Sequence, residues 1–173
     1  MQNGGFSLEE GRRMPRGLVD SLVVMHYDNE HKEARDWWAD MLEDGWEIHV
    51  SQVTLMERLK GISGLPGSRK ETLELFRFRI REMQKERMIR RIWPITRDVS
   101  KIAHSLLEQY CLRFTPPTGR ERMEGLICDM LIAATALKHG LILFTYNIRH
   151  FKWIDGLQVE RADYEIGEGD ETS

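Results

Sequence analysis

Four oxygen-bearing side chains occupy positions in this chain at which chemistry is expected. Asp20 and Asn147 each follow a short apolar run, and Glu57 lies early in a segment with helical periodicity. Asp129 is a charged residue within the otherwise apolar residues 126–139. An ionised carboxylate costs free energy to bury without a partner, so Asp129 in particular requires an explanation.

The positions of these residues predict a metal site. In open parallel sheets, ligands bind at the carboxyl ends of the strands, where Asp20 and Asn147 are expected. Carboxylates gathered at one edge repel each other unless a cation lies among them, and a set of oxygen ligands favours Mg²⁺ or Mn²⁺. We therefore predict that Asp20, Glu57 and Asp129 hold the metal and that Asn147 completes the site.

Each residue also has a structural interpretation without chemistry. Asp20 and Asn147 could be ordinary turn residues after strands. Thr54-x-x-Glu57 has the spacing of a capping box, in which Glu57 would only close a helix end. Asp129 is expected near the start of its helix, where the positive end of the helix dipole would stabilise its charge.

The elements that position these residues alternate along the chain. Short apolar runs predict strands, and apolar residues at helical spacing predict helices. The predicted strands are residues 17–19, 47–53, 92–95, 141–145 and 157–159, and the predicted helices are residues 29–42, 53–61, 68–91, 98–113 and 126–139. This alternation favours an α/β fold, a three-layer α/β/α sandwich around a central parallel sheet of four to five strands.

Some elements carry a second prediction. Pro94 suits an edge strand, since proline cannot donate to a neighbouring strand. Trp37 and Trp38 could form a base-stacking platform, but their place on the apolar stripe of a helix favours the core.

Composition limits the class of protein. The 173 residues predict one domain over residues 17–166, with a flexible lead-in at 1–16 and an acidic disordered tail at 167–173. A net charge of −3 indicates no partner by itself, and the two cysteines lack the spacing of a zinc site. Because no apolar run approaches the length of a membrane span, we expect a soluble, cytoplasmic protein with no membrane partner.

Four motifs in this order resemble the PIN domain family, and most closely the VapC-type toxins of bacterial toxin-antitoxin systems. The similarity covers about residues 17–160, and its most specific part is the third motif together with the fourth. The motifs are Leu18-Val19-Asp20-Ser21, the segment SQVTLMERLKG from Ser51, the segment DMLIAATALKHG from Asp129, and Thr145-Tyr146-Asn147.

The resemblance implies a metal-dependent endoribonuclease that hydrolyses RNA, in which Asp20, Glu57 and Asp129 bind Mg²⁺ or Mn²⁺ around the scissile phosphate. It also implies an antitoxin partner and a homodimer. Asn147 matches a fourth position that is often Asp, and His150 stands where some relatives keep an acidic residue. The departures at Asn147 and His150 support an alternative, a PIN-like module that binds RNA or protein with weak or no catalysis. His150 itself could be a proton carrier, although a surface histidine is the simpler interpretation.

Two further alternatives remain. Residues 69–97 contain ten Lys or Arg and four Glu, which suits either an RNA-guiding face or a solvated helix with internal ion pairs. A phosphoacceptor signalling domain also gathers carboxylates at strand ends, but it requires a lysine after a late strand, where this chain has Thr145-Tyr146-Asn147.

Overall fold

A computed structural model describes residues 14–63 and 69–165, and within them it forms a five-stranded sheet in which every neighbouring pair is parallel. The strand order is β3-β2-β1-β4-β5, so β1 is central and β3 and β5 are the edges. The strands are β1 (Arg16–Val19), β2 (Glu47–Ser51), β3 (Arg91–Trp93), β4 (Ile142–Thr145) and β5 (Val159–Arg161). The edge position of β3, which ends just before Pro94, confirms the prediction for that strand.

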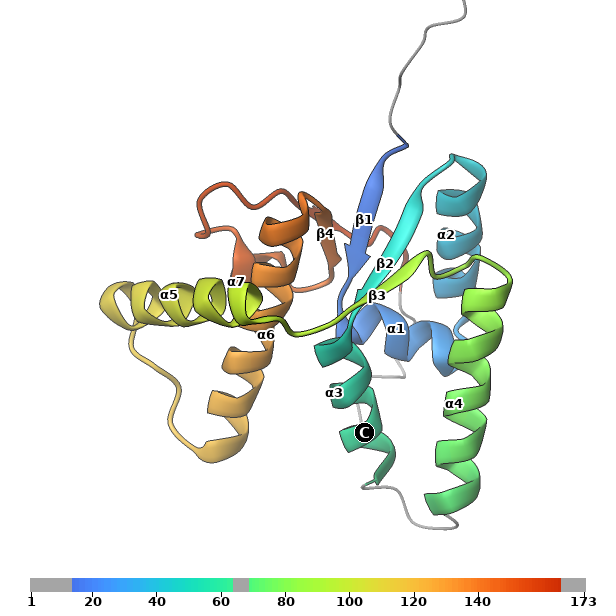
Figure 1. Cartoon of the computed structure of the whole chain (residues 1–173), viewed down its shortest axis with the longest axis horizontal. Coiled ribbons are helices and arrows are strands. Elements are labelled where there is room, and N and C mark those ends of the chain that lie inside the picture. The colour runs from blue at the N-terminus through green and yellow to red at the C-terminus, as the bar shows by residue number, and fades with distance from the viewer. Residues whose placement is uncertain (1–13, 64–68, 166–173) are drawn as a thin grey trace, which may run out of the picture.

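Helices connect the parallel strands and cover both faces of the sheet (Figure 1). On one side of the sheet lie α2 and α4, and on the other lie α5, α6 and α7. The helices are α1 (Ser21–Asp28), α2 (Lys32–Glu43), α3 (Gln52–Ser63), α4 (Arg69–Lys85), α5 (Arg97–Arg113), α6 (Arg120–His139) and α7 (Ile148–Phe151). The predicted three-layer α/β/α sandwich is therefore confirmed.

The side chains of each strand point alternately to the two faces of the sheet, and a separate hydrophobic core forms on each face. In β1, Leu18 contributes to the core beneath α5 and α6, whereas Val19 contributes to the core beneath α1, α2 and α4. Successive strand residues point to opposite faces, so one short strand supports both layers. Trp38 is fully buried in the second of these cores and Trp37 packs against it, which confirms the core interpretation of both.

Several predicted boundaries are wrong by a few residues. β2 ends at Ser51 and α3 begins at once, so the predicted strand was too long. Helix 29–42 is shorter than predicted, because α1 continues to Asp28 and a turn precedes α2. α4 ends at Lys85, well before residue 91, and β5 begins two residues later than its predicted strand.

The largest correction concerns α6, which begins at Arg120, six residues before the predicted start at 126. Its first turns are charged, and Arg120 pairs there with Glu124 at 2.8 Å in the i,i+4 arrangement that supports a helix. Asp129 consequently lies in the middle of a 20-residue helix. The dipole effect falls off within the first turn, so the prediction that it stabilises Asp129 was wrong.

The proposed acidic tail at 167–173 and most of the lead-in lie outside the described residues. Within the described part, β1 already begins at Arg16. Among the described helices, none has the length and apolar character that crossing a membrane requires.

Packing at the centre of the sheet predicts the effect of one substitution. A Cβ at Gly17 in β1 would stand 2.6 Å from the ring of Phe144, which is itself wedged between the rings of Trp37 and Trp46. Since neither the ring nor the strand can move freely, Gly17→Ala should lower the free energy of unfolding by about 1–3 kcal/mol, measured by urea denaturation.

Gly61 provides the matched control, because it lies in α3 and a Cβ there meets nothing within 4 Å. Gly61→Ala should leave stability unchanged or raise it by up to about 1 kcal/mol through helix propensity. Equal effects of the two substitutions would contradict the packing argument.

Candidate active site

Asp20 occupies the junction between the central strand and α1. It is the N-cap of α1, and its Oδ1 accepts a hydrogen bond from the Val23 backbone N–H at 3.0 Å. Its Oδ2 accepts from the Thr145 hydroxyl, at the end of the neighbouring strand β4. Only 8% of Asp20 is exposed, and this burial raises the pKa of its carboxyl to about 6 despite both hydrogen bonds. The nearby charge of Asp129 raises it further.

Glu57 projects from α3 and accepts a hydrogen bond from the hydroxyl of Ser21, the first residue of α1. Burial is the main cause of its raised pKa, and the charge of Asp129 adds to the effect. The capping-box interpretation is wrong, because α3 begins at Gln52 and Thr54 is therefore inside the helix. The Ser51 hydroxyl accepts from the Val53 N–H at 3.3 Å instead.

Asp129 faces His150 across the gap between α6 and α7. Its Oδ2 lies 2.9 Å from Nδ1 of His150, and the side chains are 27% and 57% exposed. This hydrogen bond raises the pKa of the imidazole, since the carboxylate stabilises the protonated ring. His150 is thus a surface histidine, as the simpler interpretation held, but it is paired with a predicted site residue.

Asn147 connects to the site through its backbone. Its N–H donates to the Thr145 hydroxyl oxygen at 2.9 Å, so Thr145 links Asn147 to Asp20. The Asn147 residue is exposed at the start of α7, and its side chain caps no helix N–H. The structure therefore brings all four predicted residues to one edge of the sheet, but the Asn147 side chain makes no capping hydrogen bond there.

The donor set fits Mg²⁺ or Mn²⁺ by its chemistry. Asp20, Glu57 and Asp129 supply oxygen ligands, and the charge of Asp129 raises the pKa of both other carboxyls. A cation would relieve this repulsion. Within residues 14–63 and 69–165, however, no three His, Cys, Asp or Glu side chains are close enough to hold an ion together. Each carboxylate instead faces its own donor on the protein.

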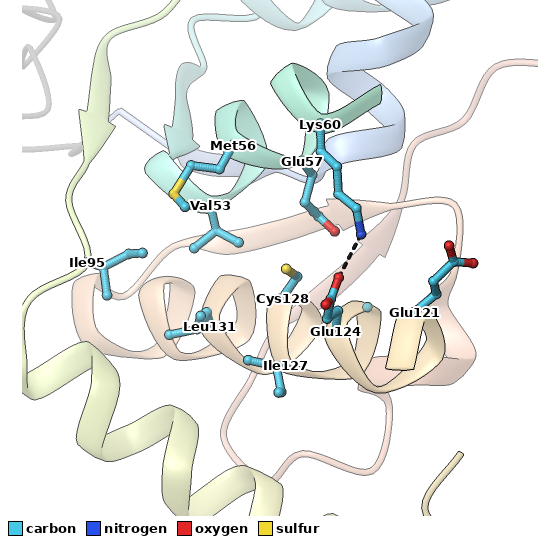
Figure 2. Close-up of a pocket in the computed structure, with 11 residues that line it drawn as sticks. Val53, Met56, Glu57, Lys60, Ile95, Glu121, Glu124, Ile127, Cys128 and Leu131 are labelled. Atoms are coloured by element: carbon cyan, nitrogen blue, oxygen red, sulfur yellow. Dashed lines mark hydrogen bonds and ion pairs between the residues drawn. The ribbon is translucent and has the colours of Figure 1, made fainter. Parts of the chain in front are cut away.

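A cavity of about 510 Å³ adjoins Glu57 between α3 and α6. Figure 2 shows Glu57 and Lys60 of α3 extending toward Cys128 and Glu124 of α6, with Lys60 Nζ 2.8 Å from the Glu124 carboxylate. Burial raises the pKa of the Cys128 thiol to about 12, so it is not a thiolate nucleophile at neutral pH. The far end of the cavity is apolar, lined by Val53, Met56, Ile95, Ile127 and Leu131.

Two residues with clear positioning roles were not predicted. Ser21 binds Glu57 and Thr145 binds Asp20, and both were present in the sequence only as neighbours of predicted site residues. The signal for Ser21 is a hydroxyl residue directly after an Asp. The signal for Thr145 is a hydroxyl residue at a strand end, two residues before an Asn.

The pKa of Asp20 predicts a pH-dependent stability. Because the folded-state pKa of about 6 exceeds the ordinary 3.8, the buried carboxylate destabilises the fold above pH 6 and has no such effect below about pH 4. Asp20→Asn keeps a capping oxygen for α1 and removes the charge. In EDTA it should raise the free energy of unfolding at pH 7.5 by on the order of 2–3 kcal/mol. The gain should shrink toward zero at pH 4, as followed by chemical denaturation at several pH values.

A pH-independent effect of Asp20→Asn would contradict this account. Asp36, which is exposed on α2 and whose one ion pair among the described residues is with Lys32, offers a control. Asp36→Asn should change stability little at either pH, because surface ion pairs contribute little.

The resemblance to the PIN domain family can be compared with known proteins. The PIN domain model matches residues 18–157. Ribonuclease VapC1 of Rickettsia felis is 25% identical over 146 residues, covering 82% of this chain and 92% of the relative. Ribonuclease VapC19 of Mycobacterium tuberculosis is 27% identical over 143 residues, covering 82% of this chain and 96% of the relative.

Solved structures share the fold. A DNA-bound VapBC complex from Salmonella typhimurium aligns with a TM-score of 0.63 at 18% identity, over 86% of this chain and 99% of that one. A toxin-antitoxin complex from Klebsiella pneumoniae aligns with a TM-score of 0.57 at 23% identity, over 87% of this chain and 99% of that one. Because the PIN domain model matches residues 18–157, which include most residues of both cores, the chain belongs to the PIN domain family.

Proposed function

We propose that this protein is a Mg²⁺- or Mn²⁺-dependent endoribonuclease that hydrolyses phosphodiester bonds in RNA, as the toxin of a toxin-antitoxin pair. The observation that carries the proposal is the electrostatic coupling of Asp20, Glu57 and Asp129 at the carboxyl edge of the sheet. The ribonuclease names of its relatives support the reaction, and the toxin-antitoxin complexes among its structural neighbours support the biological setting.

In this mechanism Asp20, Glu57 and Asp129 would hold the metal, with Asn147 as the fourth polar group. A bound divalent cation would polarise the phosphodiester and lower the pKa of a water molecule that attacks phosphorus. Thr145 and the Val23 N–H fix the orientation of Asp20. Glu57 has a raised pKa and is therefore suited to accept the proton from the attacking water. To do so, its carboxylate would first give up the hydrogen bond from the Ser21 hydroxyl.

The proposal includes two protein partners. We propose an antitoxin and a second copy of this chain, both by analogy with the relatives. Phe78 on α4 is 54% exposed and is therefore available to a partner, whereas Trp38 and Phe76 are buried. Size-exclusion chromatography with light scattering would show whether the chain is a dimer.

The basic segment is less suited to guiding RNA than its composition indicates. Arg79 of α4 pairs with Asp28 and Glu30, Lys85 pairs with Glu82, and Arg90 pairs with Glu47. These pairs neutralise part of the segment's positive charge, although only the Lys85–Glu82 pair lies within the helix.

One observation favours the alternative of a PIN-like module with weak or no catalysis. Asp129, a predicted metal ligand, is paired with His150, and the fourth position is the neutral, exposed Asn147. The site therefore has one carboxylate fewer than an all-acidic set, and an imidazole is hydrogen-bonded to one of the remaining three.

The cleavage assay distinguishes the two functions. Purified protein should cut a labelled single-stranded RNA with Mg²⁺ or Mn²⁺ and should not cut it in EDTA. Asp20→Asn and Asp129→Asn should each lower the rate by about 100-fold or more, because each removes a charge that holds the cation. The products are measured by gel electrophoresis over time.

Asp98→Asn is a suitable control for contaminating nucleases, because Asp98 is exposed on α5 and, within residues 14–63 and 69–165, forms an ion pair with Lys138 alone. It should cut like the unaltered protein at matched thermal stability. Equal cutting by all variants, or metal-independent cutting, would reject the proposed site.

Asn147→Asp tests the fourth position. An added carboxylate near a divalent cation contributes on the order of 1–4 kcal/mol at protein dielectrics, so Mn²⁺ should bind about tenfold tighter or better. Isothermal titration calorimetry measures this without RNA. Unchanged Mn²⁺ affinity would show that residue 147 lies outside the metal site.

A further inference from the structure

A second cavity lies on the opposite side of α6 from the cavity at Glu57. Its volume is about 340 Å³, within the range of small-ligand pockets. It opens between α5, α6 and the start of α7, and Asp129 and His150 form part of its wall. The remaining wall combines an aromatic ring, a guanidinium group and apolar surface from Tyr110, Arg122, Pro117 and Leu126. The cavity is thus continuous with the proposed catalytic edge.

Tyr110 belongs to an aromatic cluster that extends out of this cavity. Its ring centroid lies 5.0 Å from that of Phe114 and 5.7 Å from that of Trp153, and Phe114 and Trp153 are 5.8 Å apart. Phe114 is 44% exposed, so part of the cluster faces solvent. The indole N–H of Trp153 donates to the His150 carbonyl at 2.7 Å, which ties the cluster to the helix that carries His150.

The charge of this cavity suits a polyanion. Arg122 makes no ion pair with any residue in the described ranges, so its guanidinium is available to an anion. Arg113, outside the cavity, lies 5.8 Å from the centre of the Trp153 ring and donates to the Trp153 carbonyl at 3.0 Å, and it also pairs with Asp155 at 3.8 Å. The cavity at Glu57 has the opposite character: Glu57, Glu121 and Glu124 line it, and its Lys60 is already bound to Glu124. Unless a cation is bound there, these carboxylates would repel a phosphodiester.

Aromatic rings beside arginine are the features with which proteins bind unpaired bases, because a base stacks on the ring while the cation faces the phosphate. A paired base has both faces covered by its neighbours in the helix and cannot stack in this way. We propose that the Tyr110–Arg122 cavity binds one unpaired nucleobase of the RNA substrate, next to the scissile phosphate. This inference rests on the proposed function and adds a specificity site to it.

The test measures binding in a protein that does not cut. An Asp20→Asn background in EDTA keeps the cavity intact, because Asp20 does not line it. A fluorescein-labelled single-stranded RNA that the unaltered protein cleaves is titrated by fluorescence anisotropy. Tyr110→Leu, which removes the ring but keeps apolar volume, should weaken binding about tenfold, whereas Tyr110→Phe should bind almost normally.

Abasic substitutions in the RNA locate the base. At one position next to the cleavage point, loss of the base should weaken binding to the tyrosine protein but not to Tyr110→Leu, since the two changes remove the same contact. At other positions the two effects should add.

Arg122→Gln gives a second variant in case Tyr110→Leu folds poorly. Arg122 is exposed, so its replacement should leave the thermal midpoint unchanged while weakening RNA binding and lowering its salt dependence. Arg120→Gln removes the same charge from the same helix, but Arg120 is outside the cavity and pairs with Glu124. It should weaken binding much less.

Three outcomes would overturn the inference, and they separate it from the proposed function. Equal RNA binding by Tyr110→Leu and Tyr110→Phe, with cleavage by the unaltered protein intact, rejects the base site alone. Equal losses for Arg122→Gln and Arg120→Gln reject a specific phosphate contact. Loss of antitoxin binding with normal RNA binding would assign the cavity to a protein partner. If the unaltered protein cleaves no RNA, the proposed function itself fails.

Discussion

The burial of the Asp20 carboxylate is the constraint on which the rest of this structure depends. Asp20 joins the central strand to α1, caps that helix and accepts the Thr145 hydroxyl from the neighbouring strand. These contacts require β1 and β4 to be adjacent and in register at their ends, where Val19 pairs with Phe144. Burial raises the pKa of this carboxyl to about 6, which means that its charged form costs stability at neutral pH. This cost is the physical argument that Asp20 serves a function beyond capping α1.

The same principle explains the arrangement of the other carboxylates. Glu57 faces Ser21, Asp20 faces Thr145, and Asp129 faces His150, so each negative group has a separate donor. Such pairing reduces the repulsion that the three charges exert on one another. Binding a cation would exchange these separate partners for a shared one.

The three layers could be predicted from the sequence because the spacing of apolar residues indicates which side of a helix or strand is buried. The runs that became β1 and β4, and the apolar stripe of α2, were recognisable from their own residues. The charged first turns of α6 were missed because their stability comes from pairs such as Arg120–Glu124 rather than from burial. α7 was missed because four residues are too few to show a period. Thr145 and His150 lie 125 and 21 residues from Asp20 and Asp129, the carboxylates that they contact, so a local pattern can mark a polar residue but cannot show its partner.

The two sides of α6 differ in a way that bears on how a substrate would approach. Toward α3 the surface is acidic and the one lysine of the cavity is neutralised by Glu124. Toward α5 and α7 the surface carries Arg122, Arg113 and an aromatic cluster. Asp129 lies on the helix between these two environments, and its pairing with His150 directs its carboxylate toward the basic side. The proposed RNA strand would therefore approach the carboxylate edge from the side of Arg122, where its phosphates meet a positive charge.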